Sequence, residues 1–298
     1  MNFHQLRIFV TVANRGHLTQ AAQMLGMSQS AVSAAIKALE ASSGARLFNR
    51  VGRGIELSRA GAAFLPEAKA VLDRMLAARL VLENLSQHVV GSLSIAASQT
   101  IAGYWLPGRL AAFQERFPAV RLDVSMGNTR QVETAVLDGT ADIGLVEGRT
   151  HADTLIRSRV DVDRLVLVAA PSTTIPTGSA GPDLGAIRWV VRERGSGTRE
   201  ALEDLASRQG LLLDDLNLSL ILPSNEAVRQ AVEAGAGATV ISERVVARSL
   251  DEAALRHLPL ELPPRDFAII THGERQPSLA LAALGDLLRN NAGTTCVN

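Results

Sequence analysis

Gln29, Ser33 and Lys37 recur every four residues, so they share one face of a predicted helix. Ser30 lies beside them, and Ser28 precedes the helix. Glutamine can contact adenine through two hydrogen bonds, and serine can donate to or accept from either base pair. This face therefore suits base reading in the DNA major groove, with the N-terminal end of the helix entering the groove. The alternative is that these polar side chains only solvate a surface helix.

Two arginines, Arg50 and Arg53, lie in the stretch ARLFNRVGRGIELS, which predicts two short strands around Gly52 to Gly54. On such a wing, an arginine meets phosphate or the minor groove more readily than base edges in the major groove. A solvated loop charge is the alternative for each of them.

A second group of candidate residues lies at predicted strand-to-helix transitions. Ligands of open α/β sheets bind beyond the carboxyl ends of the strands, where helix N-termini attract anions. We expect a small carboxylic acid or an inorganic oxyanion there, although each hydroxyl is equally suited to capping a helix. The candidates are Ser98, Thr100, Asn128, Thr129, Ser196, Gly197 and Thr198, with Arg192 at the end of the preceding strand.

Glu147 ends the predicted strand ADIGLVE and is a candidate for the same site. It either neutralises Arg192 or accepts a hydrogen bond from a hydroxylated or protonated ligand.

Catalytic, metal and cofactor chemistry are not expected. Gly195-Ser-Gly-Thr lacks the Gly-Lys pair of a P-loop, and the six histidines are scattered without metal-ligand spacing. The single cysteine, Cys296, excludes disulfide frameworks and thiolate zinc sites. An enzyme or metabolite-binding protein with an accessory DNA-binding domain remains the alternative function.

The elements that position the first group follow from apolar spacing. Phe3, Leu6, Phe9, Val10 and Ala13 predict a helix over residues 3–13. Residues 18–37 then predict two crossing helices with a turn at Gly26, where positive φ is cheap only for glycine. Ser28 caps the second of these helices, which runs to about Ser43. This is a helix-turn-helix pattern.

A long helix is predicted from about residue 59 to residue 89, capped by Ser58. Its apolar residues repeat at alternating steps of four and three, which predicts a coiled-coil seam that pairs with a second copy of the chain. A core helix of a single domain is the alternative. The seam consists of Phe64, Ala68, Val71, Met75, Ala78, Leu82, Leu85 and Val89.

From Gly91 onward, predicted strands alternate with amphipathic helices, a texture that implies parallel βαβ units. The order predicts two α/β lobes joined by two crossovers, with a cleft between them. The first lobe takes about residues 91–162 and 265–290, and the second takes about residues 163–264.

Charge divides the chain in the same way. The 298 residues carry 30 basic and 30 acidic side chains, but residues 1–60 are +5 and the remainder is −5. A basic module of this size points to a polyanion partner. No secretion signal or membrane-length apolar run is recognisable, so we expect a cytoplasmic protein without a membrane partner.

The string LTQAAQMLGMSQSAVSAAIKALE, followed by GARLFNR and GIELSRAG, resembles the winged helix-turn-helix domain of LysR-type transcriptional regulators. SNEAVRQAVEAGAGATVIS resembles the second-lobe signature of that family's effector domain, so the likeness covers residues 1 to about 290. The segments SQT, GNT, LVEG and RERGSGTRE are most similar to regulators of sulfur assimilation and of carbon dioxide fixation.

This resemblance implies an α/β protein in three parts: a winged helix-turn-helix domain (1–58), a linker and dimerisation helix (59–89) and a bilobed, periplasmic-binding-protein-like effector domain (91–298). It further implies a regulator that binds double-stranded DNA and responds to a small, anionic metabolite. The resemblance also implies two kinds of assembly, a homodimer through the linker helix and a homotetramer through the effector domains. RNA polymerase is a further partner that it implies.

Overall fold

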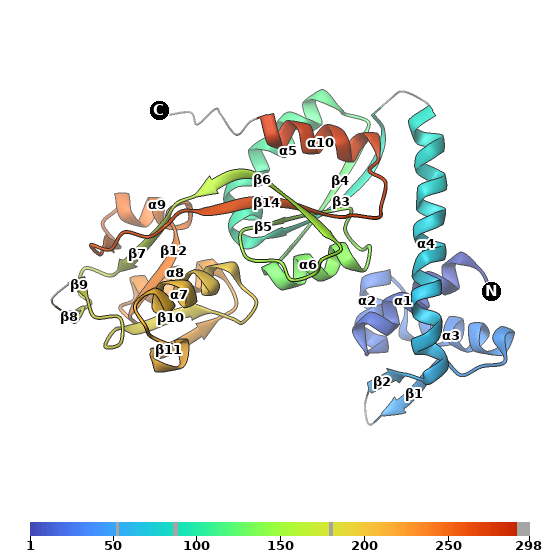
Figure 1. Cartoon of the computed structure of the whole chain (residues 1–298), viewed down its shortest axis with the longest axis horizontal. Helices are drawn as coiled ribbons and strands as arrows, with labels where there is room; N and C mark the ends of the chain where they lie inside the picture. The colour runs from blue at the N-terminus through green and yellow to red at the C-terminus, as the bar shows by residue number, and fades with distance from the viewer. Residues whose placement is uncertain (52–53, 86–88, 179–180, 291–298) are drawn as a thin grey trace. The chain divides into compact units, whose positions relative to one another are not determined.

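The computed structural model describes residues 1–51, 54–85, 89–178 and 181–290. The chain forms two compact units, one of residues 1–86 and one of residues 87–298 (Figure 1). Each unit has its own hydrophobic core.

Three helices build the N-terminal unit: α1 (Phe3–Arg15), α2 (Leu18–Leu25) and α3 (Gln29–Ser43). Gly26 ends α2 with φ +62°, and the Ser28 hydroxyl accepts a hydrogen bond of 3.2 Å from the Ala31 N–H at the start of α3. The predicted turn and cap are therefore confirmed. Of the residues whose spacing predicted α1, Leu6, Phe9 and Val10 are buried, whereas Phe3 is 52% exposed.

The wing is a two-stranded antiparallel hairpin of β1 (Phe48–Val51) and β2 (Gly54–Leu57), as predicted. The Glu40 carboxylate of α3 accepts hydrogen bonds from the N–H groups of Leu47 (2.7 Å) and Phe48 (3.2 Å). These bonds fix the base of the wing against α3.

Helix α4 (Arg59–Leu85) starts where predicted, since the Ser58 hydroxyl accepts a hydrogen bond of 3.0 Å from the Gly61 N–H. Its N-terminal half completes the core of its own unit. The Phe64 ring lies 5.2 Å from that of Phe9, and Ala68 is fully buried.

The predicted coiled-coil seam is therefore wrong for its first two members, because Phe64 and Ala68 pack within the chain itself. Val71 and Met75 are 43% and 42% exposed and remain available to a partner. The described helix ends at Leu85, and Val89 is not helical but packs against the core of the C-terminal unit.

The first lobe of the C-terminal unit has a five-stranded sheet of order β4-β3-β5-β14-β6. Apolar side chains of α5 and α10 cover one face of this sheet, and those of α6 cover the other (Figure 1). The elements are β3 (Gly91–Ser98), a π-helical turn (Ile101–Trp105), α5 (Leu106–Arg116), β4 (Val120–Gly127), α6 (Thr129–Leu137), β5 (Ile143–Val146), β6 (Leu155–Asp163), β14 (Arg265–His272) and α10 (Leu279–Asn290).

The second lobe repeats this plan with a sheet of order β11-β10-β12-β7-β13, covered by α7 on one face and by α8 and α9 on the other. Its main elements are β7 (Leu165–Ala169), β10 (Arg188–Arg192), α7 (Gly197–Arg208), β11 (Asn217–Leu222), α8 (Asn225–Glu233), β12 (Ala238–Ser242), α9 (Glu243–Asp251) and β13 (Arg256–His257). Two short strands, β8 (Thr177–Gly178) and β9 (Gly181–Pro182), and a 3₁₀ turn (Leu213–Asp215) complete it.

The chain crosses between the lobes twice, from β6 to β7 at Arg164 and from the second lobe into β14 after Pro264. Strands β3, β4 and β5 are parallel, as are β10, β11 and β12. In contrast, β14 and β7 run antiparallel to their neighbours, because each enters its sheet from the opposite lobe. No helix within the described ranges combines the length and hydropathy of a membrane span.

Candidate functional site

The predicted base-reading face of α3 is open to solvent. Gln29, Ser30 and Lys37 are exposed and Ser33 is half-buried, whereas Val32, Ile36 and Leu39 are buried in the core. The Gln29 side chain accepts only a long hydrogen bond (3.3 Å) from the Thr19 hydroxyl. These side chains are therefore free to contact a nucleic acid, and Ser28 acts as the helix cap.

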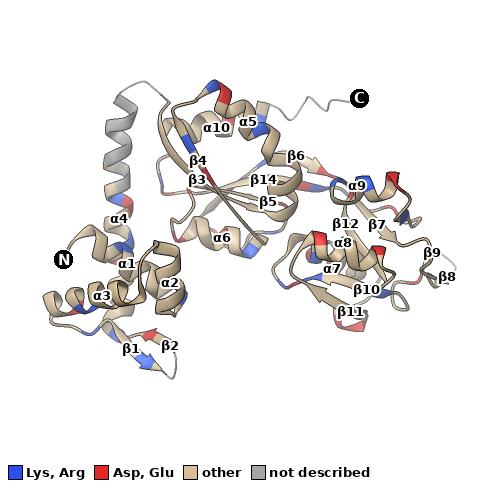
Figure 2. Cartoon of the chain, turned by 180° about the vertical axis from the view of Figure 1, so that it is seen from behind, with Lys and Arg blue, Asp and Glu red and all other residues tan. Residues whose placement is uncertain are grey.

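Basic residues lie on both α3 and the wing, as the ribbon coloured by charge shows (Figure 2). Lys37 and Arg50 are exposed and form no ion pair with a described residue. Arg53, the other predicted wing contact, lies outside the described residues.

In the C-terminal unit, the predicted ligand residues converge where the two lobes meet. Ser98, Thr100 and Glu147 of the first lobe and Ser196 and Thr198 of the second are all buried. The Ser98 hydroxyl donates to the Glu147 carboxylate. We call this buried region the inner cleft.

Burial raises the pKa of Glu147, although Arg265, with a guanidinium nitrogen 3.9 Å away, and a hydrogen bond with Thr100 oppose the shift. The carboxyl thus holds its proton to higher pH than an exposed glutamate. Of the two roles expected for Glu147, neutralising Arg192 is wrong, because Arg265 is its basic neighbour.

The Arg192 guanidinium is already hydrogen-bonded within the second lobe. It donates two hydrogen bonds of 2.8 Å to Glu193 and one of 2.6 Å to the Asn225 side chain. Asn225 in turn donates to the Thr100 hydroxyl at 3.0 Å, so it links the second lobe to the first. Arg192 therefore positions Asn225 in this structure.

Two predicted ligand residues act as helix caps. The Asn128 side chain accepts a hydrogen bond of 3.0 Å from the Gln131 N–H, and the Ser196 hydroxyl accepts one of 3.2 Å from the Thr198 N–H. Thr129 differs from them, because its buried hydroxyl has no hydrogen-bond partner among the described residues. The Thr129 hydroxyl is therefore available for a hydrogen bond with a ligand.

The lobes touch through backbone at Gly148 and Gly197. A Cβ atom on Gly197 would lie 2.8 Å from the Gly148 nitrogen, and one on Gly148 would lie 2.6 Å from the Thr129 hydroxyl oxygen. The predicted Gly197 is therefore required by this close approach, and the structure holds the lobes closed at this point.

Sequence reasoning missed three residues that organise the inner cleft: Asp163, Asn225 and Arg265. Two guanidinium nitrogens of Arg265 lie 2.8 Å from the fully buried Asp163 carboxylate. Arg265 also reaches Thr100 (3.4 Å) in the first lobe and Thr198 (3.5 Å) in the second. The sequence did contain one indication of Arg265, because this arginine directly follows Pro263 and Pro264 at a predicted crossover between the lobes.

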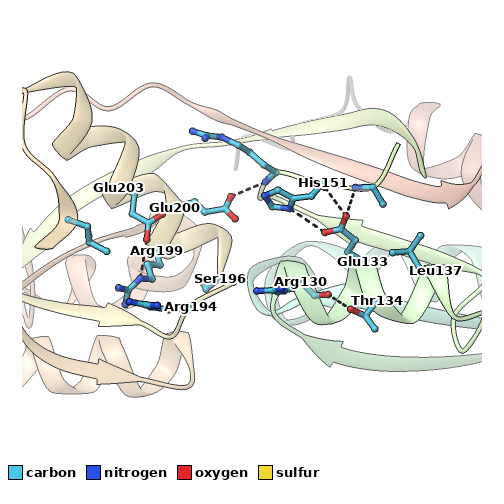
Figure 3. Close-up of a pocket in the computed structure, with 14 residues that line it drawn as sticks. Arg130, Glu133, Thr134, Leu137, His151, Arg194, Ser196, Arg199, Glu200 and Glu203 are labelled. Carbon is cyan, nitrogen blue, oxygen red and sulfur yellow. Dashed lines mark hydrogen bonds and ion pairs between the residues drawn. The ribbon is translucent and has the colours of Figure 1, made fainter. Parts of the chain in front are cut away.

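Among the described residues, cavities open between the lobes at two places that concern the predicted site. One, of about 750 Å³, lies between α6 and the start of α7 (Figure 3) and includes Ser196 in its lining. The other, of about 160 Å³, lies by the crossover and is lined by Glu147, Gly197 and Arg265, among others. Ser98 and Thr100 line neither. The described residues include no group of three potential metal ligands.

Comparison with known proteins defines the family. Residues 3–62 match the family "Bacterial regulatory helix-turn-helix protein, lysR family", and residues 86–293 match "LysR substrate binding domain". The chain belongs to the LysR family of transcriptional regulators, which are DNA-binding proteins and not enzymes.

Individual relatives agree with this assignment over nearly the full length. The chain is 35% identical over 284 residues to the transcriptional regulator YeiE of Escherichia coli K12, covering 94% of each chain. It is 29% identical to the RuBisCO operon transcriptional regulator of Allochromatium vinosum, covering 98% of this chain and 97% of the relative. The structure of full-length CbnR complexed with its target DNA matches with a TM-score of 0.55 at 25% identity, covering 98% of this chain and all of that one.

Proposed function

We propose that a small anionic metabolite binds in the inner cleft and changes how this regulator engages its promoters. The main support is Arg265, which lies at a crossover and reaches a hydroxyl of each lobe, Thr100 and Thr198. A ligand that replaced these long contacts would change the fit between the lobes. The buried hydroxyls and the N-termini of α6 and α7 favour a polar, negatively charged ligand.

The charges around the cleft restrict the ligand further. Asp163 compensates Arg265, and Glu193 compensates Arg192, so neither guanidinium is free. A raised pKa lets Glu147 bind a proton and donate to an anion. We therefore expect uptake of a proton with the ligand, and weaker binding as pH rises and Glu147 ionises.

The DNA-binding part of the proposal assigns base contacts to Gln29, Ser30 and Ser33 of α3. Lys37, Arg50 and Arg53 would contact the phosphate backbone. The exposure of Gln29 and the absence of ion pairs at Lys37 and Arg50 among the described residues support this division.

We further propose that two chains pair through α4, so that two recognition helices read two half-sites. The support is the exposed pair Val71 and Met75, four residues apart on one face of the helix. Pairing of the effector units into a tetramer is proposed from the family resemblance.

A combined binding screen tests the inner-cleft proposal. The full chain is titrated with sulfate, sulfite, phosphorylated sugars and small carboxylic acids, and its promoter footprint is recorded with each ligand. A ligand that changes the footprint of the wild type but not of a Thr100→Val variant would support it. Equal responses in both proteins would place the ligand elsewhere.

A further inference from the structure

The cavity of about 750 Å³ between α6 and α7 adjoins the inner cleft at Ser196 but contains none of its other residues in its lining, and we call it the outer cavity. Its volume is within the range of small-molecule sites. It is lined from the first lobe by residues of α6 and by Arg149, His151 and Ala152. From the second lobe it is lined by residues of the loop 194–196, by residues of α7 and by Leu213. A ligand there would contact both lobes at once.

The acidic side chains of the outer cavity are already engaged. The Glu133 carboxylate accepts hydrogen bonds from the N–H groups of His151 (2.7 Å) and Ala152 (2.8 Å). Glu203 pairs with Arg199 at 3.1 Å, and Glu200 accepts a hydrogen bond of 2.9 Å from the Arg149 N–H. The guanidinium groups of Arg149 and Arg199 are likewise paired, with Asp204 and Glu203.

Two arginines in the lining of the outer cavity, Arg130 and Arg194, have no ion-pair partner among the described residues. Neither guanidinium forms a hydrogen bond or ion pair with a described residue. Arg130 belongs to α6 of the first lobe, and Arg194 belongs to the loop before α7 of the second. Figure 3 shows Arg130 extending from its helix toward the loop that carries Arg194 and Ser196.

The backbone beneath these arginines already joins the lobes. The Arg130 N–H donates to the Gly195 carbonyl at 3.2 Å, and the Asn128 side chain donates to Glu193 at 3.0 Å. The backbone segments that carry the two arginines thus lie against each other, with partly buried Leu137 and Leu213 also in the lining. This arrangement suits two separated anionic groups joined by a short carbon chain.

We propose that the outer cavity binds an organic dianion, with one anionic group on Arg130 and the other on Arg194, and that this ligand holds the lobes together. The site goes beyond the inner-cleft function proposed above. Carboxylate and phosphate ligands share the required chemistry, because guanidinium binds either group through two parallel hydrogen bonds.

Calorimetry on the full-length protein tests this site. The probes are malonate, glutarate, pimelate and propane-1,3-diyl bis(methyl phosphate), a phosphodiester dianion, with the monoanions acetate and dimethyl phosphate and the uncharged glutaramide as controls. We expect at least one dianion to bind, while glutaramide does not. Preference for the phosphodiester or for a dicarboxylate then identifies the anionic group.

Substitutions locate the ligand. Arg130→Gln and Arg194→Gln should each raise the Kd of the bound dianion about 10-fold or more, since a charge-assisted hydrogen bond is lost. Arg130→Lys should recover part of the affinity. Arg121→Gln, which removes an exposed arginine from β4 of the same lobe, is the matched control and should leave the Kd unchanged. Because Arg130 and Arg194 are exposed, the melting temperature without ligand should stay constant.

Three results would overturn the proposal: no binding of any dianion, equal binding in the two glutamine variants, or equal binding of the monoanionic controls. Each is distinguishable from failure of the inner-cleft proposal, which is read from the promoter footprint and from Thr100→Val. A dianion whose affinity depends on Thr100 but not on Arg130 would support the inner cleft and refute the outer site.

Discussion

The proposed DNA-reading face of α3 and the inner cleft differ in how far their side chains are already bonded within the chain. On α3, Gln29 and Lys37 are exposed and have few or no internal contacts, so that surface is ready for its partner. In the cleft, Thr100 and Arg192 are buried and bonded to other residues of the chain. A ligand of the cleft must therefore replace internal bonds, which makes its binding a change in lobe contacts as well.

The largest effect should come from breaking the pairing that brings two reading faces together. Replacing Val71 and Met75 by aspartate places charges in an apolar helix pair that cannot solvate them. We expect monomers in sedimentation and a loss of operator affinity of about 100-fold or more. Ala70→Asp, on an exposed position next to this face, should leave the dimer intact. A dimer that persists through α4 in the double variant would refute the pairing.

Gln29→Ala tests whether the exposed face reads bases. We expect discrimination between operator and random DNA to fall by about 1 to 3 kcal/mol. Arg50→Ala is the comparison variant, because losing a phosphate contact should weaken all sequences equally and reduce the salt slope by about one. Gel-shift titrations at several salt concentrations measure both effects. If Gln29→Ala weakened binding to operator and to random DNA equally, Gln29 would not contact the bases.

Thr100→Val tests the opposite case, a buried group that serves a ligand. The change keeps the volume of the side chain but removes the oxygen that accepts from Asn225 and Arg265. We expect affinity for the effector to fall about 10-fold, with operator affinity in its absence nearly unchanged. Thr239→Val, at a buried threonine of β12, controls for the general cost of the substitution. Unchanged effector affinity would show that the Thr100 hydroxyl serves structure only.

The smallest expected effect concerns the proton of Glu147. Because burial raises its pKa in the folded protein, its stability contribution is complete at acidic pH and is lost as pH rises through that pKa. Glu147→Gln should thus raise the melting temperature at pH 8 by about 2 to 4 °C, for a gain on the order of 1 kcal/mol. Little gain should appear near pH 4.5. A gain of equal size at both values would exclude ionisation as its cause.

Local features of the fold were predictable because short-range chemistry determines them. Ser28 and Ser58 cap their helices through contacts three residues away, and the wing follows from glycines between two apolar runs. The seam on α4 shows the limit of this reasoning. Its spacing correctly indicated that Ala68 is buried and that Phe64 packs against a core, but spacing does not identify the surface that covers them.

The inner cleft was predictable only in part for a related reason. Ser98 and Thr100 were predicted as site residues because they lie at the end of a strand. The hydrogen-bond partners of Thr100, however, are Asn225 and Arg265, which are far away in the sequence. Such contacts depend on how two sheets meet, which no local pattern encodes. Asn128 and Ser196 looked alike in sequence as ligand residues or caps, and only the structure shows that their side chains cap α6 and α7.

The two crossovers also determine how the lobes can move. Asp163 and Arg265 are paired neighbours at the ends of β6 and β14, so both connections pass through one place. Because the two connections lie side by side, we expect the lobes to rotate about an axis through this place more easily than they slide past each other. The buried Asp163–Arg265 ion pair lies on that axis and need not break as the angle changes. Gly148 and Gly197 lie close to this axis, because their neighbours Glu147 and Thr198 come within 3.9 Å and 3.5 Å of Arg265, so their contact needs to move little when the lobes rotate.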